Sequence, residues 1–168
     1  MSGVHNEDVA LLLLRLAFGL SLAWHGVNKV RSGIAGTAGW FGSIGFRAPR
    51  LQAWTAAISE ITAGLLLAAG LLTGPSAAVM ISLMVVAIVT VHLKVGYFIF
   101  LPNGGWEYCA AIACVGAALA IAGPGAISLD RALSWEHASG ASWIAVGVVG
   151  AVCHLSVCWR PVSTGTRA

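Results

Sequence analysis

The chain has 168 residues, of which 58% are hydrophobic and only 9% are charged. Soluble domains carry roughly 25% charged residues, so this composition excludes an ordinary soluble enzyme and is typical of a membrane protein. The net charge of +3 is small and dispersed, without the Lys/Arg cluster that would indicate a nucleic-acid partner. A chain of this length predicts one domain.

Five stretches approach the roughly 20 apolar residues that a helix needs to cross a bilayer. The sequence predicts these spans at about 9–30, 51–73, 76–96, 106–123 and 142–159. We therefore expect an all-α, polytopic membrane protein with a four-helix transmembrane bundle in residues 1–133. Residues 134–168 are expected to hold a loop, a fifth C-terminal span and a short tail.

Two segments in the first third of the chain need separate interpretation. Glu7 and Asp8 precede the first apolar run where a signal peptide carries basic residues, so we interpret that run as a retained span. The segment 31–50 is too short and too interrupted to cross a bilayer. We expect an interfacial or re-entrant piece whose large side chains lie in the headgroup region. These side chains are Trp40, Phe41, Ile44 and Phe46.

The distribution of Lys and Arg predicts the orientation in the membrane. If five spans alternate, the side that receives the N-terminus carries Arg131 alone. The other side carries seven cations: Lys29, Arg31, Arg47, Arg50, Lys94, Arg160 and Arg167. By the positive-inside rule the second side is cytoplasmic, which places the N-terminus outside and the C-terminus in the cytoplasm.

Ionisable residues inside the apolar spans are the most informative feature of the sequence. Such groups are costly in hydrocarbon, so they are expected to turn toward partners in the protein interior. With a rise of 1.5 Å per residue, His25 and His92 lie about 7 and 6 Å in from the same membrane face, and Glu60 about 13 Å. Glu107 lies at the mouth of the fourth span on that face. Four spans thus each direct an ionisable group toward one level.

The residues leave four kinds of site open for this cluster. A buried ion-pair network would only fix helix packing, with Glu60 held by His25 or Lys29. A pocket for a quinone or another small substrate would use histidine and carboxylate to exchange protons with the ligand. The third is a haem with His25 and His92 as axial ligands, and the fourth a non-haem metal, although the Glu-x-x-His spacing of di-iron bundles is absent.

Other polar residues have simpler interpretations. Arg15 shares an arc of roughly 80° with His25 and Lys29 on the first span, and we expect it to bond a helix carbonyl or reach the outer interface. His154 in the last span is interpreted as a packed or hydrogen-bonded histidine. The cysteines form no CxxC pair and are expected to pack as small apolar residues, with thiol chemistry as the alternative. They are Cys109, Cys114, Cys153 and Cys158.

Several short motifs follow one another in a characteristic order. The first part of the chain holds Trp24-His25-Gly26-x-x-Lys29, then Gly36-Thr37-Ala38-Gly39-Trp40-Phe41, then Glu60 before Gly64-Leu65-Leu66-Leu67 and Gly70-Leu71-Leu72-Thr73. The second part holds Thr90-Val91-His92, Asn103-Gly104-Gly105-Trp106-Glu107-Tyr108 and Gly123-Pro124-Gly125-x-x-Ser128-Leu129-Asp130. In order and spacing, over roughly Leu11 to Leu133, these motifs resemble the DoxX family.

The resemblance implies a small bacterial inner-membrane protein with a four-helix core. Some relatives are described as part of a membrane-linked oxidoreductase assembly with a superoxide dismutase and a thiosulfate sulfurtransferase, and DoxD proteins are subunits of thiosulfate:quinone oxidoreductase. By motif position, the resemblance implies a polar site at His25, Lys29, Glu60, His92, Glu107 and Tyr108. The fifth apolar stretch lies beyond the family's usual core.

We therefore expect a membrane subunit of a redox assembly, linked to quinone or supporting thiol and thiosulfate oxidation and defence against oxidative stress. His25 and Glu60 would be catalytic and handle protons, while the other residues of the site bind the ligand. His92 and Tyr108 would position it and Lys29 would attract an anionic oxygen. No resident metal is expected, and the sequence leaves the identity of any cofactor open.

The alternative is a non-catalytic membrane anchor or scaffold for soluble redox enzymes. Arg31, Arg47 and Arg50 would supply its docking surface on the cytoplasmic face. Paired small residues predict close helix contacts, either within the bundle or between subunits of a homo-oligomer. These pairs are Gly116/Ala120 and Gly147/Ala151.

Overall fold

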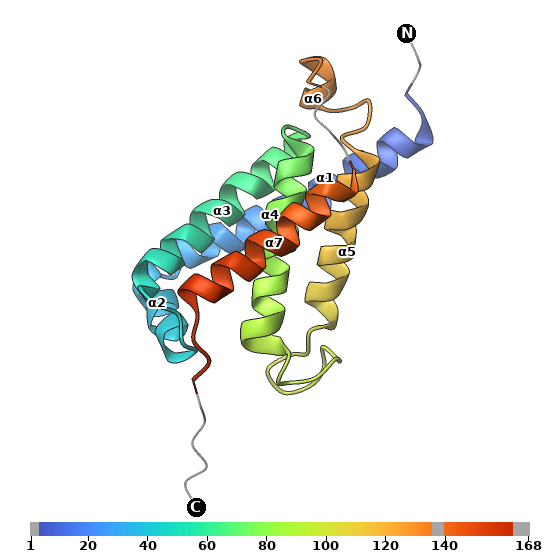
Figure 1. Cartoon of the computed structure of the whole chain (residues 1–168). Coiled ribbons are helices and arrows are strands. Elements are labelled where there is room, and N and C mark those ends of the chain that lie inside the picture. Colours follow the sequence, from blue (N-terminus) through green and yellow to red (C-terminus); the bar gives the residue numbers. More distant parts are fainter. Residues whose placement is uncertain (1–3, 136–139, 163–168) are drawn as a thin grey trace, which may run out of the picture.

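A computed structural model describes residues 4–135 and 140–162, and within these ranges the chain is helical apart from loops and one isolated β-bridge (Figure 1). The elements in chain order are α1 (Asn6–Arg31), α2 (Ile34–Ser43), α3 (Pro49–Ala69), α4 (Thr73–Ala87), the π-helix η1 (Ile88–His92), α5 (Glu107–Ala122), α6 (Leu129–Ala132) and α7 (Ala141–Cys158). The all-α prediction is confirmed, and every predicted span coincides with a helix to within a few residues.

Length separates the helices into two classes. Four in the described chain are long and apolar enough to cross a membrane, namely α1, α3, α4 continued by η1, and α7. α5 is apolar but has 16 residues, or about 24 Å at 1.5 Å per residue, against the roughly 30 Å of a hydrocarbon core. The fourth predicted span is therefore present as a helix that is shorter than expected.

The outer surface of the long helices is apolar. On α7 the outward-facing Val146, Val149 and Val152 are each more than half exposed, and Leu13 and Ile58 are similarly exposed on α1 and α3. A soluble protein would bury side chains of this kind, whereas lipid solvates them. The chain is therefore a multi-pass membrane protein in contact with the bilayer.

Small residues allow α1 and α3 to pack at very close range. A Cβ atom added at Gly19 would overlap the backbone of Gly64 and Ala68, and one added at Gly26 would overlap the carbonyl oxygen of Ala57. Close approach of this kind is typical of membrane helices, which associate through van der Waals contact of their backbones. α1 and α3 therefore form one tight pair.

α4 and α5 form a second pair, and α7 packs on α4. The predicted close contacts are confirmed at Gly116, which faces α4 near Met80 and Ile81, and at Gly147, which lies against the Ala78 carbonyl. Both contacts lie within the bundle. Figure 1 shows the α1/α3 and α4/α5 pairs diverging from the short connection between α3 and α4.

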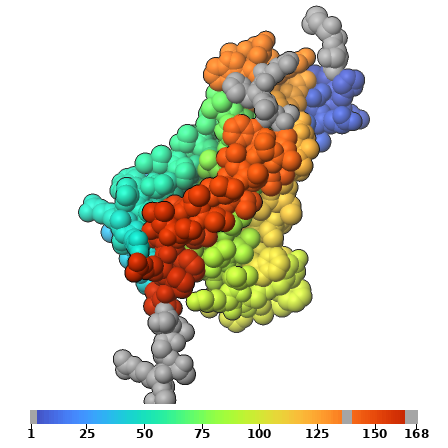
Figure 2. All heavy atoms as spheres, viewed as in Figure 1, coloured from blue at the N-terminus to red at the C-terminus, as the bar shows by residue number. Residues whose placement is uncertain are grey.

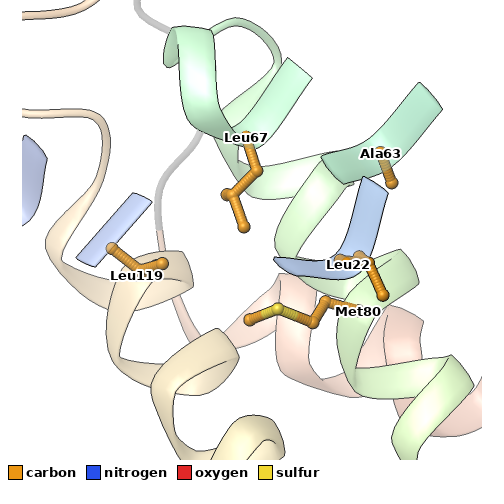
Figure 3. Packing of buried hydrophobic residues seen from close by; sticks show 5 residues of the cluster. All are labelled: Leu22, Ala63, Leu67, Met80 and Leu119. Carbon is orange, nitrogen blue, oxygen red and sulfur yellow. The ribbon is translucent and has the colours of Figure 1, made fainter. Parts of the chain in front are cut away.

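The core lies where the two pairs meet. Leu22, Ala63, Leu67, Met80 and Leu119 come from α1, α3, α4 and α5 and point toward one another (Figure 3). Leu67, Met80 and Leu119 have no exposed surface at all. This cluster fixes the pairs to each other at one end and leaves their other ends apart.

Residues 31–50 differ from expectation. They form α2 and a loop, with Ile34 buried against Ala53 and Ala57 of α3 and with Phe41 packed on the same cluster. Phe46, expected in the headgroup region, is only 7% exposed, and its ring lies tilted against that of Phe41 with 5.1 Å between the ring centroids. The segment thus turns part of its aromatic face toward the protein, because α3 offers it an apolar surface there.

The charges separate between the two ends of the molecule. α2, the α4–α5 loop and the C-terminal end of α7 lie at one end, and the start of α1, the α3–α4 connection and α6 lie at the other (Figure 1). The first end carries six of the cations predicted to be cytoplasmic, and the seventh, Arg167, lies outside the described residues. Arg131 lies at the other end, in α6.

Candidate functional site

A cavity of about 550 Å³ occupies the space between the diverging pairs. Residues from α1, α2, α3, α4, η1, α5 and α7 line it. Its volume falls within the range of roughly 300–1,000 Å³ that is typical of small-molecule sites. Five of the six residues predicted for the polar site lie on its wall: His25, Lys29, Glu60, His92 and Tyr108.

Lys29 and Glu60 form an ion pair across α1 and α3. The Lys29 ammonium donates to both carboxylate oxygens, with Nζ–Oε1 at 2.7 Å and Nζ–Oε2 at 2.6 Å. The side chains are only 20% and 10% exposed, so both charges are largely desolvated. The close approach of the backbones at Gly26, next to the Glu60 Cβ, brings the two helices near enough for this contact. Of the two partners expected for Glu60, the structure selects Lys29.

A π-helix places His92 on the cavity wall. α4 passes at Ile88 into the five-residue η1, which changes the direction of the side chains of its last turn. Single π-turns within α-helices are frequent at functional sites. His92 Nδ1 lies 2.9 Å from the carbonyl oxygen of Gly104, an acceptor, so Nδ1 carries a proton, and in the neutral ring Nε2 is then the acceptor.

Glu107 lies at the start of α5, the predicted mouth of the fourth span, but it does not line the cavity. Its Oε2 accepts a hydrogen bond of 3.1 Å from the Ile99 amide. Two further backbone bonds hold the same loop, from Trp106 to Gly96 and from Glu107 to Tyr97. Glu107 therefore stabilises the α4–α5 loop that carries Gly104. Its connection to the site is indirect, because Gly104 in that loop is the hydrogen-bond partner of His92.

His25 and Tyr108 also face the cavity, from α1 and α5. Within residues 4–135 and 140–162, neither ring nitrogen of His25 has a hydrogen-bond partner. Tyr108 is about half exposed. A ligand that entered the cavity would therefore meet polar groups that are not committed to the protein.

Arg15 lies on the same side of α1 but not at the cavity. It has no exposed surface, and its Nη2 donates to the carbonyl oxygen of Ile127 beyond α5. Nε and Nη1 have no partner among the described residues. The expected bond to a carbonyl is present, but it comes from a loop at the opposite end of the bundle.

The opposite wall of the cavity is apolar and continues into the core. Phe18, Val79, Leu83 and Ile112 line the cavity and also pack against the buried cluster around Leu22. These residues lie in the middle turns of α1, α4 and α5, whereas Lys29 and His92 lie near the ends of their helices. The cavity therefore has an apolar end beside the core and a polar end where the charged and histidine side chains gather.

Sequence reasoning missed two contributors to the wall. Trp40, Phe41, Ile44 and Phe46 line the cavity from α2 and the following loop. His154, interpreted from the sequence as a packed histidine, lines it from α7, with its ring centroid 6.1 Å from that of Phe46. The signal in the sequence that could have identified His154 is a histidine within an otherwise apolar span.

The cysteines differ among themselves. Cys109 is buried and lines the cavity, in agreement with its interpretation as a packed residue. Cys114 and Cys153 are exposed on the outside of their helices, so the prediction of packing between spans is wrong for these two. All four are free thiols. Within the described ranges, no group of three or more His, Cys, Asp and Glu side chains is arranged to hold a metal ion.

Comparison with known proteins gives one family and one relative. The family model described as DoxX matches residues 10–93, which contain His25, Lys29, Glu60 and His92. A protein of Bacillus subtilis (strain 168) named "Putative oxidoreductase CatD" is 32% identical over 123 residues, covering 73% of this chain and 86% of that protein. No solved structure matches the chain.

Proposed function

The chain belongs to the DoxX family, and from this membership and the cavity we propose that it is a membrane subunit of a redox assembly that binds a quinone-type ring between its two helix pairs. The observation that carries the proposal is the division of one cavity into an apolar end and a polar end. An amphipathic ring with an apolar tail matches that division, because its carbonyl oxygens need hydrogen-bond partners and its tail does not. The name of the Bacillus subtilis relative also supports a redox role.

The polar residues fit the ring oxygens of such a ligand. A bound quinone supplies the redox chemistry, since its reduction to a quinol takes up two electrons and two protons. The Lys29 ammonium attracts a ring oxygen that gains negative charge, while the Glu60 carboxylate holds Lys29 in place. His92 has Nε2 as an acceptor for a ring hydroxyl because Nδ1 is bonded to Gly104.

His25 and Glu60 are the groups that we propose to move protons. His25 lines the cavity, and both of its ring nitrogens are without a hydrogen-bond partner within the described chain, so either can contact the ligand. The Glu60 carboxylate, which accepts hydrogen bonds from Lys29 on both oxygens, is the second group that we propose to exchange a proton with the ligand. A positioned acid–base group of this kind contributes about 10²–10⁴-fold to a rate. The electrons would pass to or from soluble redox enzymes, such as a superoxide dismutase or a sulfurtransferase.

One purified sample tests this proposal. We would record the absorption spectrum of the detergent-purified protein, oxidised and dithionite-reduced, and extract the same sample for quinone and metals. Co-extracted quinone with a featureless visible spectrum supports the proposal. A Soret band that shifts on reduction and is lost in His25→Ala or His92→Ala overturns it in favour of haem. A sample without quinone, haem or metal supports the scaffold instead.

The scaffold has less support from the arginines than the sequence suggested. Arg31 lies over the Trp24 ring at 5.6 Å, and Arg47 donates to the carbonyl oxygen of Val157. Two of the three proposed docking cations therefore already have partners within the chain. Recruitment of soluble enzymes that survives His25→Ala and Glu60→Ala would favour the scaffold.

We propose the bacterial inner membrane as the location, with the N-terminus outside and the C-terminus in the cytoplasm. The separation of six cations from Arg131 at the two ends of the bundle supports this orientation. A green fluorescent protein fused to the C-terminus is expected to fluoresce, and an alkaline phosphatase fused there to be inactive. The reverse pattern would overturn the orientation.

A further inference from the structure

α7 is held across the opening between the two helix pairs. Its N-terminal half packs on α4, where Trp143 lies against Gly74 and Gly147 against Ala78. Its C-terminal end reaches the loop between α2 and α3, which belongs to the other pair. Figure 2 shows α7 running diagonally over the front of the molecule between these two attachments.

Four hydrogen bonds fix the second attachment, which we name the clasp and define as residues 44–47 together with 157–160. The Arg47 amide donates to Cys158 at 2.8 Å, and the Arg160 amide donates to Gly45 at 2.9 Å. The Trp159 indole Nε1 donates to the Ile44 carbonyl oxygen at 2.8 Å. The Arg47 guanidinium adds a bond of 3.2 Å to Val157. The clasp ties the end of α7 to a segment that itself lines the cavity.

The clasp requires glycine at position 45. Its φ of 99° lies in a region that side chains rarely adopt, and an added Cβ would overlap the carbonyl oxygen of Arg160. No other residue fits there without moving the two segments of the clasp apart. Gly45 itself does not line the cavity, so it controls the position of α7 without contacting a ligand.

The part of α7 just before the clasp faces the cavity. His154 and Gly150, one turn apart, both line it. His154 is partly buried beside Phe46, and within the described ranges neither of its ring nitrogens has a hydrogen-bond partner. A half-buried imidazole without a partner is costly, and that cost is recovered if a ligand supplies the bond. At Gly150 an added Cβ would meet only the Ser82 hydroxyl, at 3.8 Å, so the wall is open there.

From these contacts we propose that α7 completes the ligand site: His154 hydrogen-bonds the polar ring of the bound quinone, and the clasp positions it. This inference rests on the proposed quinone site and adds to it a binding residue outside the family match of residues 10–93. In this arrangement His25 and His154 contact the ligand from two different helices, α1 and α7.

The first test measures binding of a quinone probe. The full-length protein in lipid nanodiscs is titrated by calorimetry with menadione, and 2-methylnaphthalene serves as the probe without ring oxygens. Wild type is expected to bind menadione more tightly than the hydrocarbon. His154→Ala is expected to weaken menadione binding about tenfold, the loss of one hydrogen bond, and leave the hydrocarbon unchanged. His154→Gln should recover part of the loss, and Ser156→Ala, on the exposed side of α7, should have no effect.

Two further variants separate position from contact. Gly150→Leu fills the open wall and is expected to weaken both probes, whereas Gly150→Ala is expected to bind as wild type. Gly45→Ala opens the clasp and should reproduce the menadione defect of His154→Ala without altering a cavity-lining side chain. If Gly45→Ala does not fold, Trp159→Phe is the substitute: it removes the indole donor to Ile44 and is expected to weaken menadione binding by a smaller factor.

The outcomes distinguish the two proposals. Wild-type protein that fails to bind menadione above the hydrocarbon overturns the proposed quinone site and this inference with it. Wild-type binding that is unchanged in His154→Ala, His154→Gln and Gly150→Leu overturns this inference alone, and α7 is then a structural cover. An equal loss for both probes in His154→Ala also overturns it, because a lost hydrogen bond cannot weaken binding of a hydrocarbon.

Discussion

Helix α1 carries a fully buried cation, Arg15, and a partly buried one, Lys29, on one side, and the surroundings of each differ. Lys29 and Arg15 are 14 positions apart, or about 21 Å along the helix axis. Lys29 pairs with a carboxylate beside a cavity of about 550 Å³. Arg15 is fully enclosed, packed on Gly70, where an added Cβ would overlap its Nη1. The same polar stripe thus borders a ligand-sized space at one end and solid protein at the other.

The packing around Arg15 shows why that end is structural. Asp130 accepts hydrogen bonds from the Leu72 amide, the Thr73 amide and the Thr73 hydroxyl at 2.8, 3.0 and 2.8 Å. The Asp130 amide in turn donates to the Gly70 carbonyl oxygen. These bonds cap the start of α4 and hold the α3–α4 connection beside the enclosed Arg15 side chain. A buried charge therefore indicates a binding site only where free space lies beside it.

The largest effect on stability is expected at the enclosed end, from Asp130→Ala. Three donors at the start of α4 lose their acceptor, and each buried unsatisfied group costs about 1–3 kcal/mol, so the free energy of unfolding should fall by about 4 kcal/mol. Thermal unfolding in detergent micelles measures the loss. The affinity of the folded fraction for menadione should stay at the wild-type value. A normal melting temperature would contradict the capping role.

At the cavity end, Lys29→Ala is expected to cost about 3 kcal/mol, near the lower limit for breaking a buried ion pair, because Glu60 is left without its partner. It should also abolish menadione binding in the calorimetric assay. The double variant Lys29→Met, Glu60→Met removes both charges, so we expect it to regain most of the stability but none of the binding. Recovery of binding in the double variant would show that the Lys29–Glu60 pair serves helix packing and not ligand binding.

A smaller effect is expected from Glu107→Ala, about 1 kcal/mol, because one hydrogen bond to the Ile99 amide is lost in a partly exposed loop. The informative measurement is the ¹⁵N NMR spectrum of histidine-labelled protein. In wild type the His92 signals should show a proton on Nδ1, and in Glu107→Ala a mixture of both tautomers. The His25 signals serve as the internal control. An unchanged His92 spectrum would show that Glu107 has no influence on the protonated nitrogen of His92.

The smallest effect is expected from Arg15→Met. Nε and Nη1 of the guanidinium have no hydrogen-bond partner in the part of the chain that the structure describes, so an apolar side chain of similar length should keep the stability within about 1 kcal/mol of wild type. Arg15→Ala, which leaves a cavity, should lose about 3 kcal/mol. Unfolding of the two variants in parallel gives the comparison. Equal, large losses in both would show that the charge itself is needed.

Local physics made much of this protein predictable from its sequence. Runs of apolar residues at lipid-spanning length fix where the helices lie, since backbone groups in hydrocarbon must bond within their own segment. The cost of burying charge also predicted that His25, Lys29, Glu60 and His92 would share one interior space. The alternation of the spans placed the cations at one end of the bundle.

Only the tertiary structure decided which of these groups pair and what surrounds them. Glu60 pairs with Lys29 because small residues bring α1 and α3 together at Gly26. Glu107 does not line the cavity because its carboxylate bonds the Ile99 amide of the α4–α5 loop. The contribution of α7 also depends on packing, since the clasp joins residues more than a hundred positions apart. Helical periodicity gives the direction of a side chain on its own helix, whereas contacts between helices depend on close packing that a single segment does not encode.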